Sequence, residues 1–249
     1  MRPGSVRFHH AGNRRSAPTG YWLPGYKRIL THVIGAKVSF EIDHVVWRVN
    51  DLEAAAADVK LRYGLASVPG GRHPGWGTAN RIVPLGSSYL ELIAVVDPAD
   101  AAEDPTGRGW LAHLAKPEGP LLLCLRTDAI DAVASRLRLE VVRKSRLRPD
   151  GVEVAWRSAG LDVALKQPWL PFFICWDVPP DRHPGRTPIP GAAPGAGGIS
   201  WVQVGASSSE LSEWLGGEEL PLRLAGPPRV NAFGAALDGR EITLPGGSA

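Results

Sequence analysis

The stretch FEIDHVVWRVNDLEAAAADVKLRYGL at residues 40–65 decides the fold. Its first ten residues are mostly apolar and predict a β-strand, and the alanine-rich residues that follow predict a helix. Asp51 is a typical acidic cap for the start of that helix, and Gly64 is a typical residue at its end. The domain therefore opens with a strand followed at once by a helix.

Strands follow this opening. After the Gly/Pro-rich stretch PGGRHPGWGT (69–78), residues 79–86 and 87–97 predict two strands joined by a Gly-Ser-Ser turn. With a short strand at 65–68 the unit has the order βαβββ. After a connector at 98–116 the order repeats, with a strand at 120–128, a helix at 129–139 and strands at 140–149, 151–159 and 169–178.

The sequence therefore predicts an α+β fold made of two βαβββ modules, at residues 40–97 and 119–178. One such module has a curved sheet with a helix on only one face. Two modules side by side form a cup-shaped mixed sheet whose inner face can hold a small ligand.

Three further segments flank this predicted domain at 40–178. Residues 1–39 form a basic tail that we expect to be disordered, or that precedes the true start of the protein. Residues 179–198 are a Pro/Gly-rich linker. Residues 199–249 repeat the strand-helix-strand order, either as a truncated third module or as a β-rich segment packed on the outside of the sheet.

Charge and cysteine content exclude several classes of protein. Residues 1–40 contain seven basic and no acidic residues, so the net charge of +3 leaves −4 for the rest of the chain, which argues against nucleic acid as a partner. The two cysteines make no disulfide framework or zinc motif. Apolar runs are too short for a membrane span. We expect a cytoplasmic protein.

Three sequence features resemble a known family: the Asp-His start at 43–44, the GGRHPGWGT loop at 70–78 and the YLELI strand at 89–93. In this order and spacing they are similar to the first module of glyoxalase-like domains in the vicinal oxygen chelate superfamily. The resemblance covers about residues 41–178. It implies paired βαβββ modules around a divalent metal, and it implies that His44 and Glu91 occupy the metal-ligand positions of the first module.

Alternation along the strands places side chains independently of the family. His44 and Arg48 share one face of the first strand, and Glu91 lies on one face of the YLELI strand. A carboxylate in an apolar strand is costly to bury unless it is paired or bound to a cation. Imidazole and carboxylate together suit Zn, Fe, Ni or Mn. We therefore predict a metal site at His44 and Glu91.

The GRHPGW loop supplies further candidates. We predict His73 as a possible third metal ligand and, together with Glu91, as a catalytic residue. For substrate binding we expect Arg48 to attract a carboxylate or enolate inside the cup, Trp76 to cover an apolar group, and Thr78 and Asn80 to offer polar groups.

The second module does not repeat the metal ligands. Aligning the first strands of the two modules places Pro120 opposite His44, and aligning the last strands places Cys175 opposite Glu91. A proline side chain cannot bind a metal, and Cys175 binds one only as a thiolate. The sequence therefore predicts at most half of the usual ligand set.

Two functions remain in competition. One is a metal-dependent enzyme of the glyoxalase-like lyase or isomerase type, or of the extradiol dioxygenase type, that acts on a small oxygenated molecule. The other is a metal-free protein that binds or sequesters a small molecule in the same cup. The chain lacks the GxSxG, GxxxxGK[ST] and GxGxxG motifs of other enzyme classes. We also expect a homodimer, because a third half-cup would leave an apolar face open.

Overall fold

The computed structural model describes residues 38–148, 151–189, 196–237 and 239–245. The basic tail predicted to be disordered lies, except for its last two residues, outside the described residues. From Val38 onward the described residues belong to one compact unit. This unit contains both predicted modules and the C-terminal segment.

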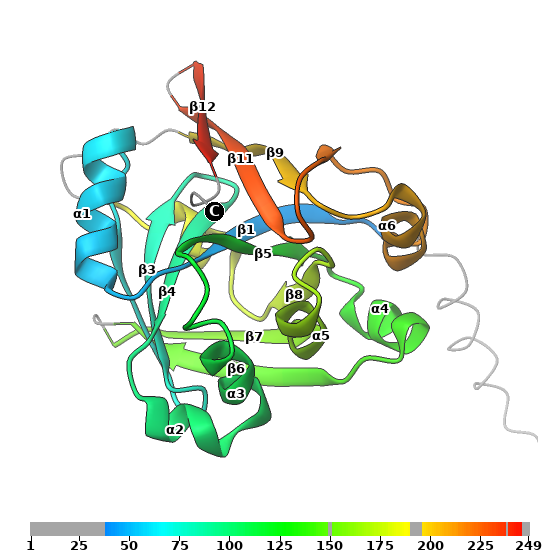
Figure 1. Ribbon diagram of the computed structural model, residues 1–249, viewed down its shortest axis with the longest axis horizontal. Helices are drawn as coiled ribbons and strands as arrows, with labels where there is room; N and C mark the ends of the chain where they lie inside the picture. The colour runs from blue at the N-terminus through cyan, green and yellow to red at the C-terminus, as the bar shows by residue number, and fades with distance from the viewer. Residues whose placement is uncertain (1–37, 149–150, 190–195, 238, 246–249) are drawn as a thin grey trace, which may run out of the picture. The chain divides into compact units, whose positions relative to one another are not determined.

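The two modules form one eight-stranded sheet. The first contains β1 (Glu41–Arg48), α1 (Leu52–Tyr63), β2 (Val68–His73), β3 (Thr78–Pro84) and β4 (Tyr89–Val95). The second contains β5 (Gly119–Arg126), α4 (Ile130–Leu137), β6 (Val141–Leu147), β7 (Glu153–Ala159), α5 (Leu161–Lys166) and β8 (Phe172–Trp176). The strand order β2-β3-β4-β1-β5-β8-β7-β6 places β1 and β5 at the centre, where the modules meet (Figure 1).

The predicted helix α1 is confirmed, together with both of its ends. The Asp51 carboxylate accepts hydrogen bonds from the backbone N–H groups of Glu53 and Ala54 at 2.9 and 3.0 Å. Gly64 ends the helix in the left-handed conformation, at a φ of 71°. Because most residues avoid positive φ, a glycine at this position ends the helix at low cost.

The prediction for β2 was wrong. The strand was expected at 65–68, but it runs through the Gly/Pro-rich stretch to His73. Gly70 makes this path possible, because a Cβ atom there would lie 2.0 Å from the side-chain oxygen of Asn80 on the neighbouring strand β3. The irregular composition hid a strand that depends on a close approach of two backbones.

The two ends of the sheet come together and close the cup. Arg146 on β6 donates a hydrogen bond from Nη1 to the carbonyl oxygen of Gly70 on β2. These strands are the first and last in the sheet order. The paired modules thus form the predicted cup, with its inner face lined by alternate residues of each strand.

Short helices occupy the connections. The connector at 98–116 contains α2 (Pro98–Glu103) and α3 (Pro105–Leu111), and the linker contains the 3₁₀ turns η2 (Pro180–Arg182) and η3 (Pro184–Arg186). Helix α5 had not been predicted. Among the described residues, no helix is both long and apolar enough to cross a membrane.

The C-terminal segment forms a second sheet. It contains β9 (Ala196–Val204), α6 (Ser208–Leu215), β10 (Leu222–Leu224), β11 (Val230–Leu237) and β12 (Arg240–Pro245). Its strand order, β10-β9-β11-β12, differs from that of the modules, in which the first strand pairs with the last. The segment thus repeats the βαβββ order along the chain with different strand pairing.

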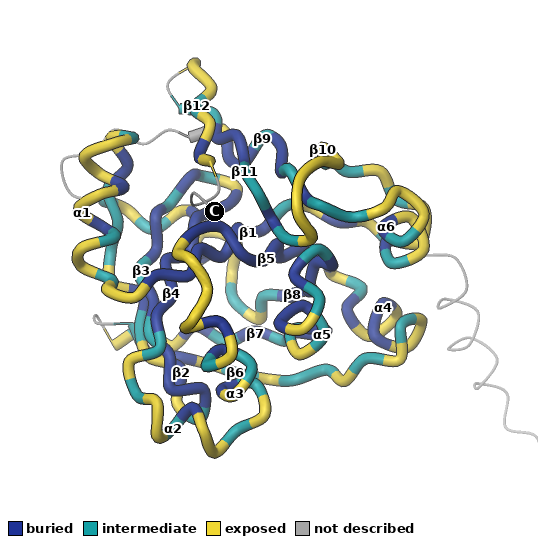
Figure 2. The backbone as a smooth tube through the Cα atoms, in the orientation of Figure 1, coloured by how far each residue is buried: buried dark blue, intermediate teal, exposed yellow. Residues whose placement is uncertain are grey.

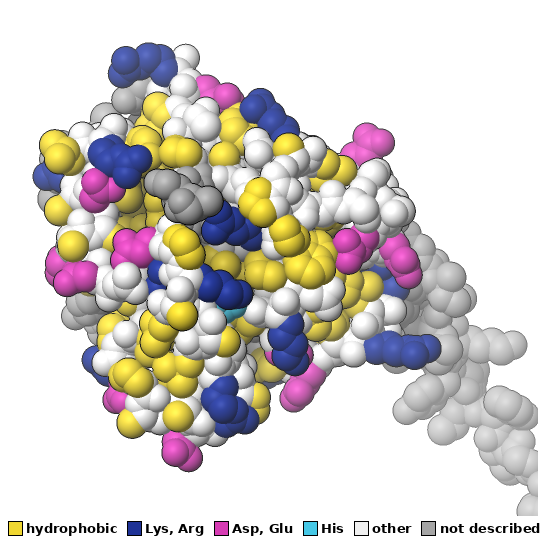
Figure 3. Space-filling model, in the orientation of Figure 1, with side chains coloured by type: hydrophobic (Ala, Val, Ile, Leu, Met, Phe, Trp, Pro, Cys, Tyr) yellow, Lys and Arg dark blue, Asp and Glu magenta, His cyan; other side chains and the backbone are white. Residues whose placement is uncertain are grey.

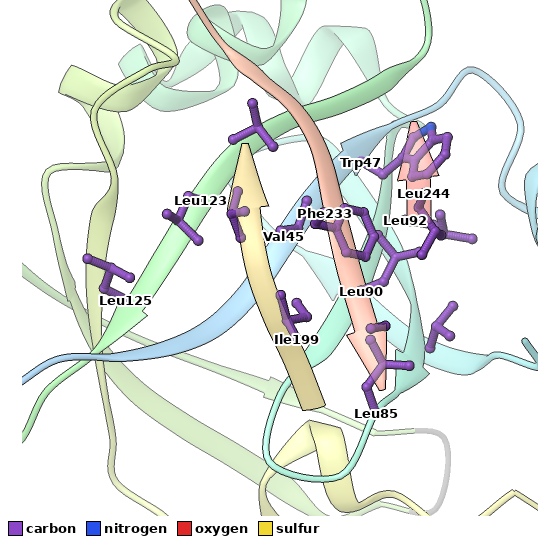
Figure 4. Packing of buried hydrophobic residues seen from close by; sticks show 14 of the residues in the cluster. Val45, Trp47, Leu85, Leu90, Leu92, Leu123, Leu125, Ile199, Phe233 and Leu244 are labelled. Atoms are coloured by element: carbon purple, nitrogen blue, oxygen red, sulfur yellow. The ribbon is translucent and has the colours of Figure 1, made fainter. Parts of the chain in front are cut away.

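The second sheet packs on the outer face of the cup. Figure 4 shows Phe233 of β11 beside Val45 of β1 and Leu90 of β4, and the rings of Phe233 and Trp47 lie 6.5 Å apart. Figure 2 shows that β1, β4 and β5 are buried along most of their length. The apolar face that led us to expect a homodimer is therefore covered within the chain.

Candidate functional site

An open pocket lies inside the cup, with about 530 Å³ of space between atoms when the solvent at its mouth is included. Its polar lining includes His44, His73, Asn80, Glu91 and Arg146. Its apolar lining includes four tryptophans, namely Trp76, Trp110, Trp156 and Trp176, together with Phe172 and Ile174. As predicted, His44 and Glu91 lie together on the inner face of the cup.

His44 and Glu91 face each other across two neighbouring strands. The Nε2 atom of His44 lies 3.4 Å from Oε2 of Glu91. Its other nitrogen, Nδ1, lies 2.7 Å from Oδ1 of Asp43. The imidazole also stacks on Tyr89, with ring centroids 4.4 Å apart. Hydrogen bonding at Nδ1 and stacking therefore fix the ring with Nε2 toward the pocket.

Asp43 reaches His44 because of a β-bulge. Ile42 and His44 pair with consecutive residues of β5, so Asp43 is an extra residue in the ladder. A bulge redirects side chains that simple alternation would place on opposite faces. Alternation along the sequence therefore did not predict that Asp43 contacts its neighbour His44.

Asp43 is the centre of a buried hydrogen-bond network. Its Oδ2 atom accepts from Trp176 Nε1 and His183 Nε2, both at 2.9 Å, and from Arg126 at 3.3 Å. Burial alone raises the pKa of this carboxyl, but hydrogen bonds from His183 and His44 outweigh it and hold the pKa well below its usual range. Asp43 is thus an ionised group that orients His44.

His183 was not a candidate in the sequence, since it lies in the Pro/Gly-rich linker. Its Nδ1 accepts a hydrogen bond from the backbone N–H of Gly185 at 3.1 Å, so Nε2 carries the proton that is donated to Asp43. Turn η3 also holds the linker against the first module, where the N–H of Gly86 donates to the Gly185 carbonyl at 2.8 Å. The linker is therefore part of the support for His44.

His73 lines the pocket beside this pair. Its Nδ1 lies 2.9 Å from the hydroxyl of Thr78, and its Nε2 lies 3.5 Å from the amide nitrogen of Asn80. The same amide nitrogen donates a hydrogen bond to Glu91. Asn80 therefore connects His73 to the carboxylate, while Thr78 orients His73 without lining the pocket itself.

Burial keeps His73 neutral. Desolvation is the main cause that lowers the pKa of its imidazole to about 4; the charge of Glu91 opposes the shift, and the charges of Arg146 and Lys144 add to it. Below that pKa the ring is protonated. At neutral pH it is neutral, and a neutral imidazole can accept a proton or bind a metal.

The two remaining predicted substrate-binding residues, Trp76 and Arg48, lie in different pockets. Trp76 lines the pocket, and the ammonium group of Lys144 lies 4.9 Å from the centre of its ring. The prediction that Arg48 lies inside the cup was wrong. Arg48 is on the expected strand face, but its guanidinium bonds to the carbonyl of Lys116 in the connection after α3 and lines a different pocket.

The predicted counterpart of His44 in the second module was also wrong. Val45 of β1 pairs with Leu123 of β5. The residue pairs and the register shifts on one side of this pair match those on the other side, so the two strands are related by a local two-fold axis through it. His44 and Leu122, each one residue earlier, are therefore equivalent, whereas the sequence alignment had chosen Pro120. The error arose because the two strands were aligned only by their pattern of apolar residues.

The counterpart of Glu91 needs a similar correction. Glu91 pairs with Val46 on β1, and Phe172 pairs with Cys124, the residue of β5 equivalent to Val46. Phe172 is therefore equivalent to Glu91. Cys175 faces α4 on the outer side of the sheet. At the two positions equivalent to His44 and Glu91, the second module has Leu122 and Phe172, whose side chains cannot bind a metal.

A different set of ligand-type atoms also clusters near His44. In the described ranges, ligand atoms of Asp43, His44 and Cys124 all lie within 4.8 Å of one another. Burial raises the pKa of the Cys124 thiol well above its ordinary value, with the charges of Asp43 and Glu91 adding to the effect. A protonated thiol is a poor ligand. This cluster is better explained as support for His44.

The pair formed by His44 and Glu91 fits a divalent cation better. Bond lengths of about 2.0–2.2 Å place two ligands of one ion roughly 3 Å apart. The separation of 3.4 Å is close to that value, and each group has a free atom, since Asp43 holds Nδ1 and Asn80 holds Oε1. A carboxylate that orients a ligating histidine is typical of metal centres.

Comparisons with known proteins agree with the fold. The family described as "Glyoxalase-like domain" matches residues 42–218. A hypothetical protein from Staphylococcus aureus shares 18% identity, with 82% of this chain and 84% of that chain covered and a TM-score of 0.54. No curated protein matches the chain significantly.

Smaller solved structures align with part of the chain. A methylmalonyl-CoA epimerase from Streptomyces coelicolor is 20% identical and covers 54% of this chain and 94% of its own, with a TM-score of 0.38. The Mycobacterium tuberculosis enzyme of the same name is 19% identical, with 54% and 85% covered and a TM-score of 0.36. The match over residues 42–218 shows that the chain belongs to the glyoxalase-like domain family.

Proposed function

We propose that the protein is a metal-dependent enzyme that acts on a small organic molecule with two neighbouring oxygen atoms. The observation that carries this proposal is the facing pair of His44 Nε2 and Glu91 Oε2, at 3.4 Å, with His44 oriented by Asp43. These two side chains would hold the metal. A divalent metal bound there supplies Lewis-acid polarisation of substrate oxygens.

The other polar groups suit substrate binding and proton transfer. His73 is neutral, buried and close to Glu91 through Asn80, so we assign it the role of proton acceptor. Arg146 lines the same pocket and carries a buried positive charge that attracts an oxyanion. Proton removal next to a polarised oxygen favours isomerase or lyase chemistry.

The tryptophans of the pocket indicate which chemical group the substrate carries beside its oxygen atoms. Trp110, Trp156 and Trp176 form an apolar wall opposite the polar strands, together with Phe172. Such a wall excludes water and accepts a hydrocarbon or aromatic group. We therefore expect a substrate with an oxygenated end and an apolar end.

Metal analysis of the full chain purified without a His tag or chelator tests the metal site. We expect a stoichiometric divalent ion in the wild type and its loss in Glu91→Gln and His44→Ala. Bound iron would favour ring-cleaving oxygenase chemistry over the isomerase or lyase type. Glu103→Gln, a change of the same kind on the exposed surface of α2, should keep the ion.

Melting temperatures separate a metal site from a structural pair. Glu91→Gln should lower the melting temperature mainly in the metal-loaded protein, because a bound ion stabilises the native state by mass action. His44→Ala also leaves Oδ1 of Asp43 without the donor that His44 supplies, and it should weaken both forms. Equal effects of Glu91→Gln with and without metal would contradict the proposal.

His73→Ala tests the proposed proton acceptor. Ligand atoms of His73, His44 and Glu91 do not all lie within 4.8 Å of one another among the described side chains. We therefore expect the variant to keep its metal and to lose turnover of any substrate found. Loss of the metal would instead make His73 the third ligand.

The metal-free binding function is the second candidate. Leu122 and Phe172 in the second-module ligand positions favour it, because they leave the cup with half of the usual donors. Absence of any bound metal in the wild type, combined with tight binding of aromatic acids in the cup, would establish this function instead.

A further inference from the structure

A second pocket, with about 660 Å³ of empty space, lies at the other end of β1. Its walls come from the end of β1, the connection between α3 and β5, the segment after α5, and the turn before β11. Figure 3 shows Lys and Arg side chains gathered in the middle of the visible face, where Figure 1 shows the α3–β5 connection. This pocket is separate from the cup.

The charge in this pocket has one sign. Arg48, Lys116, Lys166 and Arg229 line it, and no carboxylate of a described residue does. Within the described part of the chain, none of these four side chains has a carboxylate oxygen within 4.0 Å. Burial lowers the pKa of Arg48, and the negative charge of Glu118 acts in the opposite direction. The Glu118 carboxylate itself accepts a hydrogen bond from the backbone N–H of Asn50 at 2.7 Å.

Several residues that line this pocket have a buried polar atom without a hydrogen-bond partner among the described residues. These atoms are Nε of Arg48, Nε of Arg229, Nε1 of Trp169 and Nδ1 of His113. Arg48 is 4% exposed and His113 is 1% exposed. Buried donors and acceptors in proteins nearly always have partners, so these four atoms leave hydrogen-bonding capacity beside the pocket that the described residues do not use.

The buried members are already held in position. Arg48 donates from Nη1 to Asn50 at 2.8 Å and from Nη2 to the Lys116 carbonyl, which leaves Nε free. His113 donates from Nε2 to the Leu165 carbonyl at 2.8 Å, which leaves Nδ1 free. Side chains fixed in this way lose little entropy when a ligand binds.

We propose that this pocket binds the phosphate group of a small organic phosphate. Four positive side chains and three unpaired N–H groups match the several oxygens of a phosphate better than the two oxygens of one carboxylate. The indole of Trp169 and the prolines of the lining supply an apolar surface for the organic part.

Burial gives His113 a supporting role. Desolvation lowers the pKa of its imidazole, and the charges of Lys116 and Arg48 lower it further, while the hydrogen bond to Leu165 acts in the opposite direction. An anion beside Nδ1 offsets the effect of these cations. His113 can then take a proton and become a further donor.

Calorimetric titration and ³¹P NMR of the full chain with inorganic phosphate and pyrophosphate test the proposal. We expect saturable binding of both, with pyrophosphate tighter and with an increase in melting temperature. Citrate, a polycarboxylate of similar charge, should bind more weakly. Citrate binding as tight as pyrophosphate, or no binding of either phosphate at millimolar concentration, would overturn the assignment.

Matched variants locate the binding. Arg229→Gln should weaken pyrophosphate binding by about tenfold, because hydrogen bonds to charged groups are stronger than neutral ones. Lys166→Gln, at an exposed position, should weaken it less. Arg240→Gln removes the same charge from exposed β12 and should change nothing. Equal weakening by Arg240→Gln would show general charge attraction and reject the pocket.

Discussion

The two modules of the cup share one backbone plan but present different chemistry. At two equivalent positions the first module has His44 and Glu91, while the second has Leu122 and Phe172. The first module thus supplies the polar wall and most of the candidate reactive groups. The second supplies an apolar wall. Equivalent strand positions therefore fix where a side chain points, and the residue type decides whether it reacts or packs.

This division sets different demands on the two walls. Polar groups of the first module must be oriented by partners, and Asp43 and Asn80 provide these hydrogen bonds. Apolar groups of the second module contribute by filling space, and Phe172 packs in a buried cluster with Val46 and Ile174. Substitutions in the second module should thus affect stability most, and those in the first should affect binding.

The largest effect is expected for Phe172→Ala. The side chain is buried, so its removal should lower the free energy of unfolding by about 3 kcal/mol. Denaturant unfolding with and without a divalent metal measures this loss. The same loss in both conditions agrees with a packing role, whereas a loss limited to the metal-loaded protein would make Phe172 part of the metal environment.

A smaller loss is expected for Asp43→Asn. The amide keeps the shape but gives up the charged acceptor of several hydrogen bonds, which should cost about 2 kcal/mol. Asp58→Asn, an exposed change on α1, is the control and should cost about 0.5 kcal/mol or less. If both variants unfold alike in urea, the Asp43 network contributes nothing to stability.

The smallest effect is expected for Cys175→Ala. Cys175 faces α4 and accepts a hydrogen bond from Arg157 at 3.0 Å, so its removal should leave metal content unchanged. Burial also raises the pKa of this thiol, although Arg157 opposes the shift. The thiolate fraction at neutral pH is correspondingly low, and alkylation of the native protein should be slow. Metal loss in this variant would restore Cys175 as a ligand.

Local patterns in the sequence were enough to predict the fold and the first pair of residues that line the pocket. The repeated βαβββ order predicted the cup, and alternation placed both His44 and Glu91 on its inner face. These inferences succeeded because strand alternation and helix caps depend on neighbouring residues. Trp76, His73 and Asn80 also reached the pocket, since their loop and strand adjoin the same sheet face.

Other features depended on partners that are distant in the chain. The bulge that joins Asp43 to His44 exists only in the pairing with β5, and His183 comes from the linker about 140 residues later. Arg48 follows the predicted alternation, yet the α3–β5 connection places it in the second pocket. Outside the bulge at Asp43, the sequence alone determined which residues share a strand face. Only the tertiary structure decided which of them share a pocket, because pockets are made by contacts between elements and not by periodicity within one.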